Sequence, residues 1–147
     1  MVKMFVLAAM LFAATSHSVV ARDRCTKGSE FEPPLCPLAM SPIARLVIEE
    51  NGAKSSLASE ASTDCSSFVL TEKLVRRYLS RAKRVPAGGA HSTLDWSPCY
   101  ASGKVLFKDG RSAQWRVSQL RVGSLSVDGQ AEQTLYCSTC KDKPFGW

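Results

Sequence analysis

Two periods in the hydrophobic pattern divide the chain into a helical segment and a series of strands. Over residues 71–84 the apolar positions recur every three or four residues and cover roughly 140° of a helical wheel. They are Leu74, Val75, Tyr78, Leu79 and Ala82. Thr71 is suited to capping the first turn, and Pro86 cannot continue a helix. The pattern therefore predicts an amphipathic helix over residues 71–84.

From residue 103 onward the hydrophobic period changes to two, which is typical of strands with one buried face. The alternating runs cover residues 103–108, 113–117, 122–127 and 134–137. Asp-Gly pairs at 109–110 and 128–129 are strong hairpin signals. Together they predict an antiparallel meander of three or four strands in which Trp115 is buried.

A weaker alternation covers residues 43–50 and is followed by Asn51-Gly52, a further turn signal. The predicted fold class is α+β: one amphipathic helix packed on an antiparallel β-meander and braced by disulfides. We assign residues 43–147 to this single domain. The segment 22–42 is rich in proline and charge, shows no period, and is predicted to be an irregular N-terminal arm that Cys25 and Cys36 pin to the domain.

The first 21 residues have the pattern of a removable signal peptide. Lys3 supplies the positive start, residues 4–14 form an apolar run, and Val19 and Ala21 suit a cleavage site. The run is too short to span a bilayer, which requires roughly 20 apolar residues. We therefore expect an exported protein, periplasmic or secreted, with no transmembrane segment in the mature chain.

All six cysteines follow the predicted cleavage site, and an even number in an exported chain indicates disulfide bonds. The candidates are Cys25, Cys36, Cys65, Cys99, Cys137 and Cys140. The pair in Cys137-Ser138-Thr139-Cys140 is predicted to be structural, bonded internally or to Cys65 and Cys99. Two alternatives are a thiol-redox pair and a zinc site completed by Cys99 and His91. The structural interpretation implies no cofactor and no metal.

Charge is distributed unevenly along the mature chain. Without Lys3 the chain has 18 basic and 13 acidic residues, a net charge of +5. Residues 22–70 have a net charge of −2 and residues 71–147 a net charge of +7. The polar arc of the predicted helix has six cations: Lys73, Arg76, Arg77, Arg81, Lys83 and Arg84. Arg111, Arg116 and Arg121 on the meander are expected to widen this basic surface.

Several segments resemble small exported bacterial proteins of uncharacterised function. The similar stretches lie within about residues 65–140 and read LTEKLVRRYL, LDWSPC, VLFKDGRSAQWRV, RVGSLSVDG and LYCSTC. They consist mostly of turn, core and cysteine positions. The resemblance therefore implies a shared scaffold and supplies no catalytic residue.

These features favour a non-enzymatic binding protein of the cell envelope that presents the basic helix face to a partner. The partner is expected to be an acidic protein or an anionic envelope component, since an exported protein seldom meets nucleic acid. An inhibitor or immunity-type protein fits this class. His91, Ser92 and Asp95 are the only candidates for acid–base chemistry and form no known catalytic motif, so we assign no catalytic residue. The alternative function is thiol-redox or metal-binding chemistry at the CSTC motif.

Overall fold

The computed structural model describes residues 24–57, 62–89 and 93–146. The predicted signal peptide lies outside these residues, as do His91 and Ser92. Within the described ranges, no helix has the length and apolar character needed to cross a bilayer.

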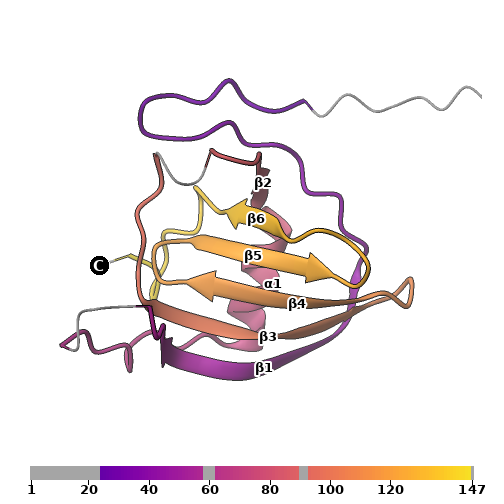
Figure 1. Ribbon diagram of the computed structural model, residues 1–147. Helices are drawn as coiled ribbons and strands as arrows, with labels where there is room; N and C mark the ends of the chain where they lie inside the picture. Colours follow the sequence, from indigo (N-terminus) through magenta and orange to yellow (C-terminus); the bar gives the residue numbers. More distant parts are fainter. Residues whose placement is uncertain (1–23, 58–61, 90–92, 147) are drawn as a thin grey trace, which may run out of the picture.

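The described chain forms helix α1 and six strands (Figure 1). The elements follow in the order β1 (Ile43–Lys54), α1 (Glu72–Arg81), β2 (Lys83–Val85), β3 (Cys99–Phe107), β4 (Ser112–Ser118), β5 (Val122–Val127) and β6 (Gln133–Tyr136). The strands make an antiparallel sheet with the spatial order β1-β3-β4-β5-β6-β2. Strands β3 to β6 are thus consecutive both in the chain and in the sheet, while β1 and β2 form its two edges.

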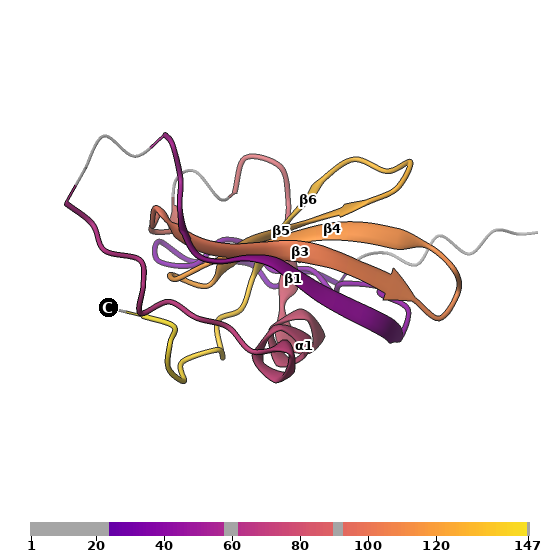
Figure 2. The same cartoon turned by 90° about the horizontal axis from the view of Figure 1, so that it is seen from below.

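The two faces of the sheet differ in polarity because side chains alternate along each strand. The inner face is apolar, and its larger members are Val105, Phe107, Trp115, Val117, Leu125 and Leu135, all with at most 2% of their surface exposed. The buried position predicted for Trp115 is confirmed. Helix α1 and the C-terminal segment lie on this side of the sheet (Figure 2). Val75, Tyr78 and Leu79 of the helix belong to the same buried cluster.

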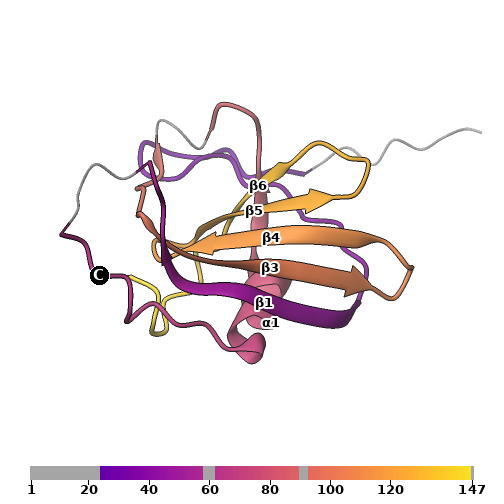
Figure 3. The same cartoon turned by 60° about the horizontal axis from the view of Figure 1, so that its bottom comes forward.

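Helix α1 is shorter than the sequence pattern predicts. The Thr71 side chain accepts a hydrogen bond from the Leu74 amide and caps the N-terminus. The helix ends at Arg81, because Ala82 already has an extended backbone with ψ near 146°. The predicted extension over Lys83 and Arg84 is wrong, since both residues lie in β2 and pair with Tyr136 and Leu135 of β6. The chain thus crosses the sheet as a helix and joins its far edge as a strand (Figure 3).

The turn predicted at Asn51-Gly52 is also wrong, because β1 continues through both residues to Lys54. Gly52 has a positive φ of 62° and lies where the pairing between β1 and β3 shifts register. Such a bulge lets the strand bend without ending. The Asn51 side chain makes two hydrogen bonds of 2.8 Å with the backbone of Leu70 and ties β1 to the start of α1.

Three disulfides join Cys25 to Cys36, Cys65 to Cys99, and Cys137 to Cys140. The disulfide expectation is therefore confirmed. The arm is not pinned as predicted, because Cys25 and Cys36 bond to each other within it. The arm joins the sheet through backbone hydrogen bonds of 2.9 Å in both directions between Cys36 and Arg84.

Tyr78 connects helix, sheet and C-terminal segment in the core. Its ring stacks on Phe145 at a centroid distance of 5.9 Å, and its hydroxyl donates a 3.0 Å hydrogen bond to the carbonyl of Arg121. Gly123 makes room for this hydroxyl, since a Cβ atom there would lie 2.7 Å from it. Burial, and secondarily the proximity of Tyr136, raises the pKa of Tyr78 well above its usual value of 10.

We predict that Tyr78 weakens the fold in alkali. Because the pKa of Tyr78 is raised in the folded state, its contribution is complete below about pH 10 and is lost as the pH rises further. The free energy of unfolding should therefore fall as the pH rises above 10. Urea unfolding between pH 9 and 12 measures it.

The variant Tyr78→Phe should lose about 1 kcal/mol at neutral pH, the usual contribution of one hydrogen bond. It should also show a shallower decline in alkali than the unchanged protein. Tyr136→Phe, at a half-buried position, is the matched control. Parallel alkaline profiles for Tyr78→Phe and the unchanged protein would contradict this account.

Candidate binding surface around helix α1

The six cations predicted on one helix face come from two elements. Lys73, Arg76, Arg77 and Arg81 lie on α1, whereas Lys83 and Arg84 belong to the short strand that follows it. The six cations are therefore neighbours in the sequence, but they do not lie on a single helical arc.

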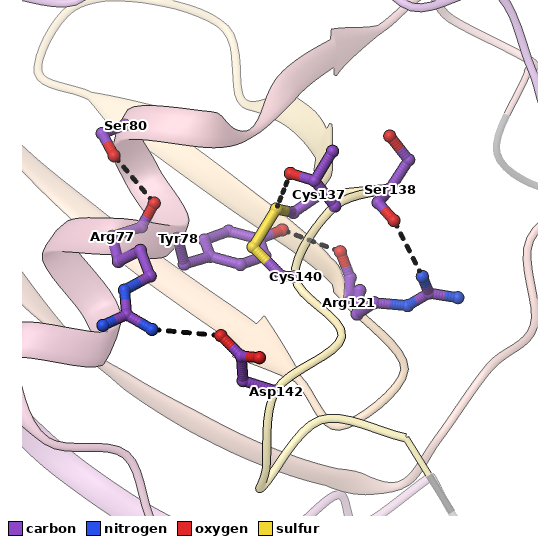
Figure 4. Close-up of a disulfide and its surroundings, with 9 residues drawn as sticks. Arg77, Tyr78, Ser80, Arg121, Cys137, Ser138, Cys140 and Asp142 are labelled. Carbon is purple, nitrogen blue, oxygen red and sulfur yellow. Dashed lines mark hydrogen bonds and ion pairs between the residues drawn. A yellow bond between two sulfur atoms is a disulfide. The ribbon is translucent and has the colours of Figure 1, made fainter.

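Two of the arginines are neutralised by carboxylates. Arg76 bonds to Glu72 one helical turn earlier, with its Nη2 atom 2.7 Å from the Glu72 Oε1 atom. Arg77 donates a 3.1 Å hydrogen bond to Asp142 in the C-terminal segment (Figure 4). The first pair is an i,i+4 pair within one helix, which can be recognised from the sequence alone. The second joins residues 65 positions apart, which no local pattern reveals.

The side chains of Lys73, Arg81 and Lys83 remain exposed, and no described carboxylate forms an ion pair with them. We call these three residues the basic triplet. Exposed cations on long flexible side chains contribute little to stability, so they are free to interact with a partner. The triplet, rather than all six cations, is the part of the predicted site that is available for binding.

A hollow of about 430 Å³ lies between α1 and the end of the arm, and Lys83 is the member of the basic triplet that lines it. Leu38, Met40 and Pro42 supply apolar lining, while Arg76 and Lys83 supply charge. Sequence analysis did not find this hollow because the arm lacks any period that would place it against the helix. The hollow therefore combines apolar and cationic lining.

The three meander arginines do not widen the basic triplet as predicted. Arg116 alternates with the buried Trp115 and Val117, so it lies on the sheet face away from α1. Arg111 pairs with Asp109 at 2.8 Å, and Arg121 donates to the Ser138 carbonyl at 3.1 Å. The alternation in the sequence already indicates that Arg116 faces away from the core, and therefore away from the face on which the helix was expected to pack.

The CSTC motif forms a closed disulfide within a turn at the end of β6 (Figure 4). Cys137 is completely buried and Cys140 has 4% of its surface exposed. Described residues 141–146 contain turns and bends but no helix whose N-terminus would activate a thiolate. The pair is therefore closed and buried in the folded state, without the helix N-terminus that lowers a thiol pKa in thiol oxidoreductases.

The remaining candidates for chemistry are dispersed. His91 and Ser92 lie outside the described residues, and Asp95 lines a hollow on the opposite face of the sheet. In the described ranges, no cluster of three or more His, Cys, Asp or Glu residues could hold a metal ion. All six cysteines are bonded in disulfides, which leaves none as a thiolate ligand.

No protein-family model, curated protein or solved structure matches this chain significantly. The resemblance to small exported bacterial proteins therefore stays a prediction. The candidate surface is therefore described only from the positions of its own residues.

We predict that the CSTC disulfide resists reduction in the folded protein better than the Cys25–Cys36 disulfide does. Cys25 is exposed, whereas both cysteines of the CSTC pair are buried. With increasing dithiothreitol, alkylation mapped by mass spectrometry should label Cys25 and Cys36 first. Cys137 and Cys140 should react only as the protein unfolds. Earlier labelling of the CSTC pair, with the circular dichroism spectrum unchanged, would favour the redox alternative.

Proposed function

We propose that this protein is a non-enzymatic binding protein that uses the basic triplet and the adjoining hollow to hold an acidic segment of a partner protein. The observation that carries the proposal is the exposure of Lys73, Arg81 and Lys83 without described acidic partners, together with the partly apolar hollow that Lys83 lines. An inhibitor or immunity-type protein is one member of this class. An exported location, periplasmic or secreted, forms part of the proposal.

The scaffold supports this function by holding the cations on a braced frame. In the proposed arrangement α1 is packed on the strands β3 to β6, and the hydrogen bonds between Asn51 and Leu70 fix the segment that enters the helix. The backbone that presents the cations is therefore fixed before a partner binds, which reduces the ordering cost of association. An electrostatic surface of this kind also increases the association rate at low ionic strength.

An acidic protein segment fits better than a purely ionic polymer because the hollow is partly apolar. A polyanion would use only the cations, whereas a peptide can place an apolar side chain between Leu38 and Met40. The thiol-redox and metal-binding alternatives gain no support from a buried, closed CSTC pair.

We predict that reversing the charge of the basic triplet abolishes binding of an acidic peptide. The variant Lys73→Glu, Arg81→Glu, Lys83→Glu should bind a glutamate-rich peptide with a central leucine at least tenfold more weakly at low salt. Fluorescence anisotropy of the labelled peptide measures the dissociation constant. The matched control reverses Arg45, Lys104 and Lys108, which lie on β1, β3 and the hairpin that follows β3.

A partner that uses the hollow as well as the charges should distinguish two peptides. Replacing the central leucine by serine should weaken binding to the unchanged protein, whereas the triplet variant should hardly discriminate between them. An equal loss of peptide affinity in the triplet variant and the control variant would show that the effect depends only on net charge. Unchanged binding by the triplet variant, with an unchanged melting temperature, would remove this surface from consideration.

A further inference from the structure

The sheet face opposite α1 contains a second hollow, unrelated to the basic triplet. It has a volume of about 550 Å³, which is within the range of roughly 300–1,000 Å³ typical of small-molecule sites. Tyr100 of β3, Arg116 and Ser118 of β4, and Ser124 of β5 contribute to its lining, together with Trp96 from the segment before β3.

Arg116 is held in a fixed orientation within this hollow. Its guanidinium lies 3.5 Å from the centre of the Tyr100 ring, a stacked geometry that leaves the edge of the guanidinium available. The stack follows from strand register: Tyr100 pairs with Ser118, which makes Arg116 its diagonal neighbour. Among the described residues, no carboxylate pairs with Arg116.

Tyr100 is positioned in turn by Glu50. The Tyr100 hydroxyl donates a 3.2 Å hydrogen bond to the Glu50 Oε1 atom, and Ser102 donates a 2.6 Å hydrogen bond to Oε2. Both carboxylate oxygens are therefore engaged. Glu50 thus holds Tyr100 in place, and the Tyr100 ring in turn orients the guanidinium of Arg116 toward the hollow.

The other groups of the hollow suit a ligand with many hydroxyls. Ser124 and Thr134 line it, and their hydroxyls form no hydrogen bond with any described residue. The Ser118 hydroxyl is buried and likewise lacks a partner in the described chain. A buried hydroxyl without a partner costs about 1–3 kcal/mol, so the floor of the hollow is less than fully satisfied in the described chain.

Trp96 and Asp95 complete the site. The Trp96 side chain has 61% of its surface exposed, unusual for so large an apolar group, and its ring offers a flat apolar face. Asp95 can accept hydrogen bonds from ligand hydroxyls. An acidic sugar matches these groups: its ring can pack on the flat face of Trp96, its hydroxyls can bond to the hydroxyls and carboxylate of the site, and its own carboxylate can pair with Arg116.

We propose that this hollow binds a small acidic sugar, with its carboxylate paired to the Arg116 guanidinium and its ring packed on Trp96. Arginine matches a carboxylate with two parallel hydrogen bonds, which neither a neutral sugar nor a lysine can reproduce. The volume is sufficient for one or two sugar rings. The proposal is independent of the basic triplet, which lies on the other side of the sheet.

The test is titration calorimetry with digalacturonate, glucuronate and N-acetylneuraminate, with galactobiose as the neutral counterpart of the first. We expect an acidic sugar to bind and galactobiose to bind at least tenfold more weakly. Arg116→Gln should weaken the acidic sugar at least tenfold, and Arg116→Lys should recover little of the loss. Trp96→Ala should also weaken it, and the signals of Trp96, Tyr100 and Ser124 should shift in nitrogen–proton correlation spectra.

Two variants control for charge and for the other surface. Arg45→Gln removes the same charge from exposed β1 outside the hollow, and Arg81→Glu alters the basic triplet; both should bind as the unchanged protein does. The proposal is overturned if none of the three acidic sugars binds at millimolar concentration. It is also overturned if Arg116→Gln binds normally, or if glucose 6-phosphate binds more tightly than every carboxylate sugar.

Discussion

The whole structure depends on covering one apolar sheet face with a helix that is too short to do so alone. Ten residues of α1 extend about 15 Å, whereas six strands at roughly 4.8 Å spacing span about 24 Å from edge to edge. The remaining cover comes from Phe68 and Leu70 before the helix and from Phe145 near the C-terminus, all of them buried. Hydrogen bonds anchor both segments, Leu70 to Asn51 and Gly146 to Gln119, and a covalent restraint adds to these bonds.

The disulfides supply that restraint. Cys65–Cys99 attaches the segment that leads into α1 to the first residue of β3, and Cys137–Cys140 closes the turn from which the C-terminal segment leaves β6. All four cysteines belong to the buried cluster. In the chain-entropy model a crosslink stabilises more as the loop it closes becomes longer, so Cys65–Cys99, with a separation of 34 residues, contributes more than Cys137–Cys140, with a separation of 3. The cysteines are therefore part of the cover, and this explains why the CSTC pair is buried.

The hydrophobic alternation and the turn residues in the sequence correctly predicted those features of the fold that neighbouring residues determine. Alternation located Trp115 in the core, and the Asp-Gly pairs at 109–110 and 128–129 coincide with positive φ values at Gly110 and Gly129. The predictions were wrong where contacts with a segment distant in the sequence determine the secondary structure. Arg84 left the helix because β6 and Cys36 offer its backbone hydrogen bonds on both sides.

The same distinction applies to the binding surfaces. The cations were visible in the sequence, and so was the Glu72–Arg76 pair, but the loss of Arg77 to Asp142 depends on where the C-terminal segment returns. Alternation alone places Arg116 toward solvent. Its stack on Tyr100 requires the register between β3 and β4, which an alternating pattern does not specify.

A single layer of strands keeps the two proposed surfaces chemically distinct while linking them physically. The basic triplet lies on the helix side, and Arg116 points to the other side, so the two do not merge into one electrostatic patch. They are connected at the start of β5: the Tyr78 hydroxyl from the helix side bonds to the Arg121 carbonyl, and Gly123 lines the sugar hollow. Because Gly123 has no side chain, the Tyr78 hydroxyl reaches the strand closely, and a shift of α1 would be felt at the floor of that hollow.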